Sequence, residues 1–349
     1  MKIFNRTISE KKPPFVVAEI SANHNNNLQR TLKLVDEAKK AGADAVKIQT
    51  YKADTITLNS RKKDFLINDK KSLWHGKYLY ELYQKGSTPW EWHKEIFERA
   101  KKNRIFCFSS PFDETAVDFL KKFKPPVYKV ASFENNHEPL IKKIISTNKP
   151  IIVSLGLTKL KDIKNLVSIF KKNKYKNFAL LKCTSAYPSK LEESNLRTIL
   201  DLKKKFQVEI GLSDHTPGIG AAIAAIAYGA TIIEKHFTLN KKAGGFDDIF
   251  SIEPHELSSL VLESRRAWLS LGKVFYSYTK SEKRHSIFKR SIYTSKDIKK
   301  GDFFSEKNIK IVRPNKGLHP KYYFKILRKK SLKNLKYATP IKKNFIKFD

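Results

Sequence analysis

Two histidines stand at the ends of two apolar segments of the sequence. His215 lies in GLSDHT (211–216), and His236 lies 21 residues further on in IIEKHFT (232–238). If the two segments are adjacent strands of a parallel sheet, both imidazoles meet at one edge, where they suit a divalent metal ion with carboxylates nearby. The alternative is a hydrogen-bonded structural histidine at each position. The shared place at the ends of adjacent strands favours the metal site.

These strands belong to a longer alternation of short apolar runs, typical of strands, with amphipathic patterns typical of helices. The strand-like runs lie at 15–20, 45–50, 105–110, 127–132, 150–155, 178–183, 208–213 and 231–236. Helical patterns separate most of them, and an eighth helical pattern follows at 253–272. Eight such units predict an α/β fold, a (β/α)8 TIM barrel, because the runs are almost continuously apolar, as parallel strands covered on both faces are.

Polar and ionisable side chains gather at the carboxyl ends of these predicted strands, where barrel enzymes build their sites. In chain order they are Glu19, Lys47, Ser110, Lys129, Ser132, Glu134, Ser154, Ser185, Tyr187, Ser213, His215, His236 and Asp247. Buried polar groups without partners destabilise a fold, so their gathering indicates a polar ligand. Lysines with several hydroxyls suit a phosphate and a carboxylate. Gly218 and Gly220 let backbone amides approach an anion.

Three further stretches complete the predicted organisation. The connection over 51–88 is long and carries Trp74, Tyr78, Tyr80 and Tyr83, so we expect a lid or a subunit contact, with a packed surface excursion as the alternative. The barrel is predicted over 1–272 and a polar, basic linker over 273–288. Short β runs and turn signals then predict a small β-rich domain over 289–349.

The formal net charge of +36 raises the possibility of nucleic-acid binding. The lysine runs are spread along the chain, however, and no zinc-finger spacing or basic-region heptad accompanies them, which favours solvated helix faces. Cys107 and Cys183 lie in apolar runs and indicate buried thiols of a reducing compartment. With no apolar signal segment and no run long enough for a membrane span, we expect a cytoplasmic protein that binds neither membrane nor nucleic acid.

Ordered motifs along nearly the whole chain resemble the nonulosonic acid synthases, the family that includes sialic acid synthase. They are AEISANHNNNL, ADAVKIQTY, STPWEWHKEIF, YKVASFE, GLSDHT, IIEKHFTL, FSIEPHE, FKRSIY and IVRPNKGL. EISANH, ASFE and LWHGKYLYELY are most similar to the pseudaminic acid subgroup. The resemblance implies a TIM barrel followed by an antifreeze-like (SAF) domain, in a domain-swapped homodimer.

The resemblance also implies a reaction. Phosphoenolpyruvate, water and 2,4-diacetamido-2,4,6-trideoxy-L-altrose would give pseudaminic acid and phosphate, with manganese or magnesium held by His215 and His236 as the Lewis acid. A sister enzyme making N-acetylneuraminate or legionaminic acid is the alternative, and a basic nucleic-acid-binding protein is an alternative of another class.

By the same resemblance, each site residue acquires an expected role. Carboxylate binding falls to Lys47, Ser110 and Lys129, phosphate binding to Ser132, Ser154, Ser185 and Ser213, proton transfer to Glu19 and Glu134, and sugar contact to Asp247 and Arg313, the last from a partner subunit. Lys47 and Lys129 also count as catalytic, and Tyr187 as substrate-binding. Asp214 is expected to support His215. The sequence departs from the family at SLGL (154–157), FENNHEPL (133–140) and Phe246. We expect these departures to affect the sugar side of the site more than the phosphoenolpyruvate side.

Overall fold

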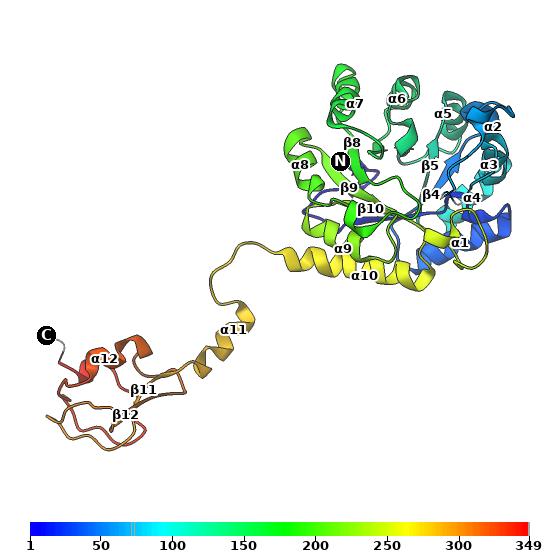
Figure 1. The fold of residues 1–349 in the computed structure, drawn as a ribbon. Helices are drawn as coiled ribbons and strands as arrows, with labels where there is room; N and C mark the ends of the chain where they lie inside the picture. The colour runs from blue at the N-terminus through cyan, green and yellow to red at the C-terminus, as the bar shows by residue number, and fades with distance from the viewer. Residues whose placement is uncertain (71, 73, 348–349) are drawn as a thin grey trace. The chain divides into compact units, whose positions relative to one another are not determined.

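The computed structural model describes residues 1–70, 72 and 74–347. Lys71 and Leu73 of the long connection, and Phe348 and Asp349 of the small domain, lie outside the described residues. The chain forms two compact units, Met1–Gly272 and Lys273–Asp349 (Figure 1). Each unit is described by itself below.

The first unit is a closed barrel of eight parallel strands, so the predicted barrel is confirmed. The strands are β3 (Phe15–Glu19), β4 (Ala45–Thr50), β5 (Phe106–Pro111), β6 (Tyr128–Val130), β7 (Ile151–Ser154), β8 (Phe178–Cys183), β9 (Glu209–Asp214) and β10 (Ile232–His236). The last strand pairs with the first, with His236 beside Glu19. All eight strands therefore end at one rim.

Helices cover the outside of the barrel (Figure 1). They are α1 (Leu28–Lys40), α4 (His93–Lys102), α5 (Glu114–Lys121), α6 (Glu138–Ile145), α7 (Leu160–Lys172), α8 (Thr198–Phe206), α9 (Gly220–Ala227) and α10 (Pro254–Leu271). Side-chain caps set where some of them begin. The Asn27 side chain accepts from the amide of Arg30, and the Asp113 carboxylate accepts from the amides of Thr115 and Ala116.

The inside of the barrel has its own apolar layer, separate from the core between strands and helices. It includes Phe15, Phe108, Ile152 and Ile232, all fully buried. A hairpin that the sequence analysis did not predict, β1 (Lys2–Ile3) with β2 (Arg6–Thr7), belongs to the same unit, and Ile3 joins this layer. The amino-terminal end of the barrel is therefore filled by hydrocarbon, and polar groups are left to the other end.

The connection between β4 and α4 is folded rather than irregular. It contains α2 (Ala53–Ile56) and α3 (Leu79–Gly86). The Tyr80 hydroxyl donates to Asp54 Oδ1 at 3.0 Å, and the Tyr83 ring lies edge-on to the Tyr51 ring, with 6.1 Å between centroids. These contacts hold the connection against the barrel rim.

The second unit has a small core of its own. Its elements are α11 (Lys280–His285), β11 (Ser291–Thr294), β12 (Ile309–Val312) and α12 (Tyr323–Ile326). Strands β11 and β12 pair antiparallel, and isolated bridges connect most of the remaining segments. Ile292, Phe304 and Ile341 are fully buried among them. Among the described residues of both units, no helix is long and apolar enough to cross a membrane.

Candidate active site

Side-chain alternation along the strands brings the predicted residues together. Inward positions recur at every second residue of a strand. Above the apolar layer, the next inward positions carry Glu19, Lys47, Ser110, Lys129, Ser154, Cys183, Ser213, Glu234 and His236, all of them buried. The predicted strand-end residues therefore converge on the axis of the barrel at its carboxyl end.

A network of lysines and carboxylates occupies the centre of this cluster. Lys47 Nζ lies 2.6 Å from Glu19 Oε2 and donates to Glu234 Oε1 at 2.8 Å. Lys129 Nζ lies 3.7 Å from the same Glu234 oxygen. Burial opposes the charge on Glu234, but the two ammonium groups outweigh it and lower its pKa to about 2. Burial lowers the pKa of Lys47 to about 8, so the ammonium form still dominates at neutral pH.

Hydroxyl groups surround the lysines. Lys129 Nζ donates to Ser154 Oγ at 2.7 Å, and Ser213 Oγ donates to Glu234 Oε1 at 3.2 Å. Ser110 is fully buried, and its Oγ has no hydrogen-bond partner among the described residues. A buried hydroxyl without a partner costs about 1–3 kcal/mol, which an oxygen-rich ligand would recover. This side of the cluster is therefore suited to a small anion.

A tight turn brings two more serines into the cluster. The Gly156 amide donates to Ser132 Oγ at 3.2 Å. A Cβ atom at Gly156 would lie 1.9 Å from Ser185 Oγ, so the close approach requires glycine. Asn135, in one of the stretches that depart from the family, donates through Nδ2 to the carbonyls of Ser154 and Gly156. Asn135 thus supports the serine side of the site, although we expected this departure from the family to affect the sugar side.

The two histidines lie side by side, with 5.3 Å between ring centroids. His215 Nδ1 lies 2.9 Å from the Thr184 carbonyl oxygen, which fixes that nitrogen and leaves Nε2 free. His236 Nδ1 has no hydrogen-bond partner and lies 3.8 Å from Asp247 Oδ2. Burial, and then the neighbouring positive charges, hold the pKa of His236 well below its usual value, so its ring is neutral.

This pair fits a divalent metal ion by the chemistry of its donors. The neutral His236 ring with its unpartnered nitrogen is a good metal ligand, and the Thr184 carbonyl orients the His215 ring as outer partners of metal-binding histidines do. Burial opposes the charge on His215, but the hydrogen bond and charge of Cys183 outweigh it and raise its pKa, so a metal ion there would displace a proton from this ring. In the described part of the chain, no three or more histidine, cysteine or acidic side chains form a ready-made metal cluster. The protein would therefore supply two imidazole nitrogens and leave other positions to oxygen ligands.

Cys183 and Glu234 were not among the predicted site residues. Cys183 Sγ lies 3.8 Å from His215 Nδ1, 3.4 Å from Ser132 Oγ and 3.5 Å from Ser185 Oγ. Burial raises the pKa of this thiol, but the hydrogen bond and charge of His215 outweigh it and lower the pKa to about 6. Alternation with the inward Ala179 and Leu181 was the signal in the sequence that marked Cys183 as facing the site.

Among the described residues Asp214 makes no hydrogen bond to His215, and it acts on this ring only through its charge, which is one of the causes that raise the pKa of His215. Asp214 lies one residue beyond the inward Ser213 and faces the other way. Its Oδ2 accepts from Lys235 Nζ at 2.7 Å, and its Oδ1 accepts from the amide and hydroxyl of Thr216. Asp214 and Lys235 are register partners on β9 and β10, so the two outward side chains form a buried ion pair behind the site.

Aromatic side chains wall the histidine side. The Tyr187 ring lies 4.5 Å from the His215 ring and 5.3 Å from the Phe250 ring, centroid to centroid. Trp74 of the long connection lies 6.1 Å from Tyr187. Lys77 of the same connection lies 5.0 Å from the centroid of Phe246, the residue that departs from the family. The long connection therefore reaches the wall of the site.

Asp247 and Glu134 lie at the edge of the cluster. Asp247 Oδ2 accepts from the Ala22 amide at 3.3 Å, and burial raises the pKa of this carboxyl. Glu134, in the 3-10 turn Ser132–Glu134, has an Oε2 without a hydrogen-bond partner. Burial raises its pKa to about 7, although Lys129 and Lys47 act in the opposite sense. Arg313 is exposed in the second unit, and the structure does not place it relative to this cluster.

The raised pKa of Glu134 leads to a pH-dependent prediction. As a base, its carboxylate accepts a proton only when ionised, so kcat/KM should rise with pH through about 7. In Glu134→Gln, we expect kcat to fall at least about tenfold and the rise near pH 7 to disappear. Steady-state phosphate release between pH 5.5 and 8.5 measures both. An unchanged rise in Glu134→Gln would assign the titration to another group.

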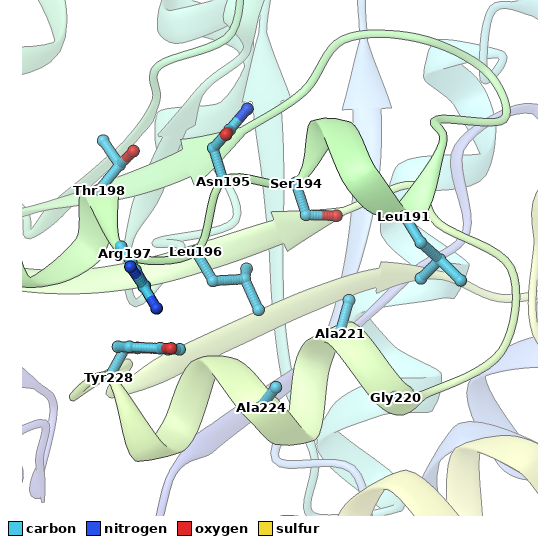
Figure 2. Close-up of a pocket in the computed structure, with 10 residues that line it drawn as sticks. All are labelled: Leu191, Ser194, Asn195, Leu196, Arg197, Thr198, Gly220, Ala221, Ala224 and Tyr228. Carbon is cyan, nitrogen blue, oxygen red and sulfur yellow. The ribbon is translucent and has the colours of Figure 1, made fainter.

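Two pockets lie away from this cluster. One, of about 550 Å³, lies over α8 and α9 and includes Leu196, Arg197 and Tyr228 in its lining (Figure 2). The other, of about 890 Å³, lies near Phe4 and Asp44. Of the residues that the sequence analysis placed at the site, only Gly220 lines either pocket, and no side chain of the lysine–histidine cluster does. The assignment of the active site therefore rests on the converging polar side chains and not on either of these pockets.

Comparisons with known proteins agree with this geometry. The chain is 47% identical to the pseudaminic acid synthase of Campylobacter jejuni, over 95% of this chain and 96% of the relative. It is 37% identical to the N,N'-diacetyllegionaminic acid synthase of the same organism, over 93% and 98% of the two chains. The crystal structure of N-acetylneuraminic acid synthetase from Leptospira borgpetersenii, in complex with citrate, superimposes with a TM-score of 0.73 at 32% identity, covering 82% of this chain and 94% of that one.

Family models match both units. The SAF domain model matches residues 289–347 in the second unit. The NeuB family model matches residues 34–276, which include almost the whole barrel and every predicted site residue of the first unit except Glu19. The chain belongs to the NeuB family.

Proposed function

We propose that this chain is a pseudaminic acid synthase. It joins phosphoenolpyruvate to 2,4-diacetamido-2,4,6-trideoxy-L-altrose and, with one water molecule, forms pseudaminic acid and inorganic phosphate. The observation that carries the proposal is the similarity along nearly the whole chain to a pseudaminic acid synthase, ten percentage points above that to a legionaminic acid synthase of the same organism. The alternative is an N-acetylneuraminate or legionaminic acid synthase. Because the chain is still 37% identical to the legionaminic acid synthase, the test below includes the sugars of these enzymes.

The reaction makes one carbon–carbon bond and breaks one carbon–oxygen bond. C3 of phosphoenolpyruvate attacks the sugar aldehyde carbon, and the aldehyde oxygen takes up a proton to become a hydroxyl group. Water adds at C2 and loses a proton. The bond from C2 to the bridging oxygen then breaks, phosphate leaves with that oxygen, and C2 becomes the ketone carbon of the product.

The basic and hydroxyl groups of the cluster suit the two anionic groups of phosphoenolpyruvate. Lys47, Lys129 and Ser110 would bind its carboxylate, since two ammonium groups and an unpartnered hydroxyl lie there. Ser132, Ser154, Ser185 and Ser213 would bind its phosphate. Glu234 holds both lysines in place before the substrate arrives, which makes it a positioning residue for the anion site.

The remaining groups suit the sugar and the protons. His215 and His236 would hold manganese or magnesium, which as a Lewis acid polarises a carbonyl oxygen. Two glutamates would transfer protons to and from water and the sugar hydroxyl: Glu134, whose pKa is about 7, and Glu19, whose carboxylate forms an ion pair with Lys47. Asp247 and Tyr187 would contact the sugar. The unpaired cysteines, Cys107 and Cys183, support a cytoplasmic location.

Phosphate release from phosphoenolpyruvate with each candidate sugar tests the proposal. We expect release with the altrose derivative and at least about tenfold lower kcat/KM with N-acetylmannosamine or the legionaminic acid precursor sugar. The reverse preference would replace the proposal by the sister activity. Release with none of the three sugars, by a folded protein supplied with manganese, would contradict both.

We propose further that the active form is a homodimer in which Arg313 reaches the partner subunit's barrel. Arg313 is exposed and forms no ion pair among the described residues, and its planar fork suits an amide carbonyl or hydroxyl of the sugar. Arg313→Ala should raise KM for the sugar about tenfold or more and leave KM for phosphoenolpyruvate within about twofold. Equal changes in both KM values would contradict this assignment.

Mixed dimers separate action within a subunit from action between subunits. We would co-purify a His215→Ala subunit with an Arg313→Ala subunit, using two different tags. If Arg313 acts on the partner, the one site in each mixed dimer that keeps His215 also receives an intact Arg313, and KM for the sugar returns to the parental value. If it acts within its own subunit, the site that keeps His215 lacks Arg313, and KM for the sugar stays as high as in Arg313→Ala.

A further inference from the structure

We propose that the barrel carries a second ligand site, at its amino-terminal end, that binds a nucleotide. The site is the pocket of about 890 Å³ beside the β1–β2 hairpin, which we call the basal pocket. Phe4 of the hairpin, Asp44 just before β4 and Phe106 at the start of β5 all line it. It therefore lies at the opposite end of the strands from the lysine–histidine cluster, and its volume is within the usual range for small-molecule sites.

The charges around the basal pocket strongly favour an anion. Six basic residues line it, against the two acidic residues Asp44 and Glu98; they are Lys39, Lys94, Lys101, Arg104, Lys124 and Arg265. Asp44 is already engaged, since its Oδ2 accepts from the Val16 amide at 2.9 Å and its Oδ1 lies 3.6 Å from Arg6. The acidic groups in the wall therefore leave most of the positive charge unbalanced.

Most of these cations form no ion pair or hydrogen bond with the described residues, although the charges of Arg265 and Lys39 act on Asp44. Lys39 Nζ donates to the Arg104 carbonyl at 3.1 Å. The side chains of the other five form no ion pair or hydrogen bond with any residue that the structure describes. Some lysines and arginines elsewhere are paired, as Lys142 is with Glu138 and Arg99 with Asp36, but most of those that the structure describes are not. The gathering of these cations around one concavity therefore distinguishes them, rather than their lack of partners. Five unpaired cations around one concavity suit the several charges of a polyphosphate.

An aromatic surface in the same pocket adds a place for a planar ring. Phe4 is 57% exposed although it is a large apolar side chain. One side of it lies against Phe106, with 6.0 Å between centroids and 23° between the rings. Lys149 Nζ lies over the ring, 5.9 Å from its centroid, so a stacked base would compete with this ammonium group. Stacking of a nucleobase on an aromatic ring contributes about 1–3 kcal/mol. The combination of a stacking surface with unpaired cations points to a nucleotide rather than to inorganic phosphate alone.

The pocket over α8 and α9 does not share these features. It contains a single basic residue, Arg197, beside the apolar Leu191, Leu196 and Ala224 (Figure 2). Like the basal cations, Arg197 is exposed and has no ion pair among the described residues. It therefore provides a control: a reversal of a single charge, half the change made in the double variant below, in a pocket that we do not expect to bind a polyanion.

Isothermal titration calorimetry of the full chain with ATP tests the proposal. The buffer contains EDTA, and saturating phosphoenolpyruvate occupies the catalytic anion site. We expect one ATP per chain with a Kd below about 1 mM, at least about tenfold weaker binding by tripolyphosphate, and none by adenosine. In Lys101→Glu/Arg104→Glu, ATP affinity should fall at least about tenfold, whereas Arg197→Glu should stay within about twofold of the parent.

Each contrary outcome overturns a stated part of the proposal. Absence of ATP binding, or equal loss in Arg197→Glu, excludes the basal pocket as the site. Binding of tripolyphosphate as tight as that of ATP excludes a nucleotide-specific site, as does an unchanged preference for ATP in Phe4→Ala. If Lys101→Glu/Arg104→Glu does not fold, Lys94→Glu/Lys124→Glu replaces it, because both of these side chains are exposed.

Discussion

Replacing His215 by alanine should lower kcat/KM for phosphate release by at least about a hundredfold, and His236→Ala should do the same. The two imidazoles lie together, His236 is neutral, and His215 is held by the Thr184 carbonyl. A Lewis acid contributes several kcal/mol to stabilising the transition state, and each 1.36 kcal/mol corresponds to tenfold in rate. Treatment with EDTA should therefore reduce the parent enzyme to a similar level, and added manganese or magnesium should restore it.

His255→Ala is the matched control for this experiment. His255 lies on α10 with its side chain 76% exposed, near Glu253 and away from the cluster. It should keep parental turnover. Metal content measured by mass spectrometry gives a readout independent of activity, since His215→Ala should bind less than one tenth of the manganese bound by the parent. Full turnover after complete metal removal would overturn the role of the two histidines.

Replacing Lys47 by methionine should remove activity and also lower the free energy of unfolding by about 3–5 kcal/mol. Lys47 lies between Glu19 and Glu234, at 2.6 and 2.8 Å, and all three side chains are buried. Methionine has nearly the same length but leaves two buried carboxylates without this partner. Urea denaturation followed by circular dichroism measures the loss of stability.

A double variant separates the structural effect from the catalytic one. In Lys47→Met/Glu234→Gln, one unpaired charge is gone, so part of the lost stability should return while activity should not. The exposed pair of Lys40 and Glu37, 2.7 Å apart, provides the control, and Lys40→Met should leave the midpoint of urea denaturation at the parental value. A Lys47→Met protein as stable as the parent would mean that water reaches and solvates the two carboxylates.

The barrel could be predicted from the sequence because two features that determine it, the apolar runs and the parallel direction of the strands, can be recognised in short segments. Apolar runs of strand length mark where the eight strands lie, and parallel strands bring their ends to one rim wherever the helices fall. Hence Lys47, Lys129, Ser154 and His236 could be grouped before any coordinates were known. How deep these residues lie, and which of them pair with one another, could by contrast be known only from the closed barrel.

The errors and omissions share one cause, which is the direction of side chains within a strand. Strand ends were read as sets of polar residues without asking which face each residue takes. Asp214 was therefore placed with His215 although its carboxylate turns to Lys235, Cys183 was left out although it faces inward, and Glu234 was given no role. The first apolar layer inside the barrel settles the choice, because residues two positions beyond Leu181 and Ile232 must share its face.

The packing of the barrel's amino-terminal end constrains the order of events in catalysis. Ile3, Ile8 and Phe15 block that end, so everything that enters or leaves the cluster passes the rim near Tyr187 and Trp74. Glu234, which contacts both lysines of the anion site, lies one inward position deeper on β10 than His236. Because the site has a single entrance, the substrate that binds deeper must bind first, and the product formed from its deeper part must leave last. We therefore expect phosphoenolpyruvate to bind before the sugar, and phosphate to leave after the nine-carbon acid product.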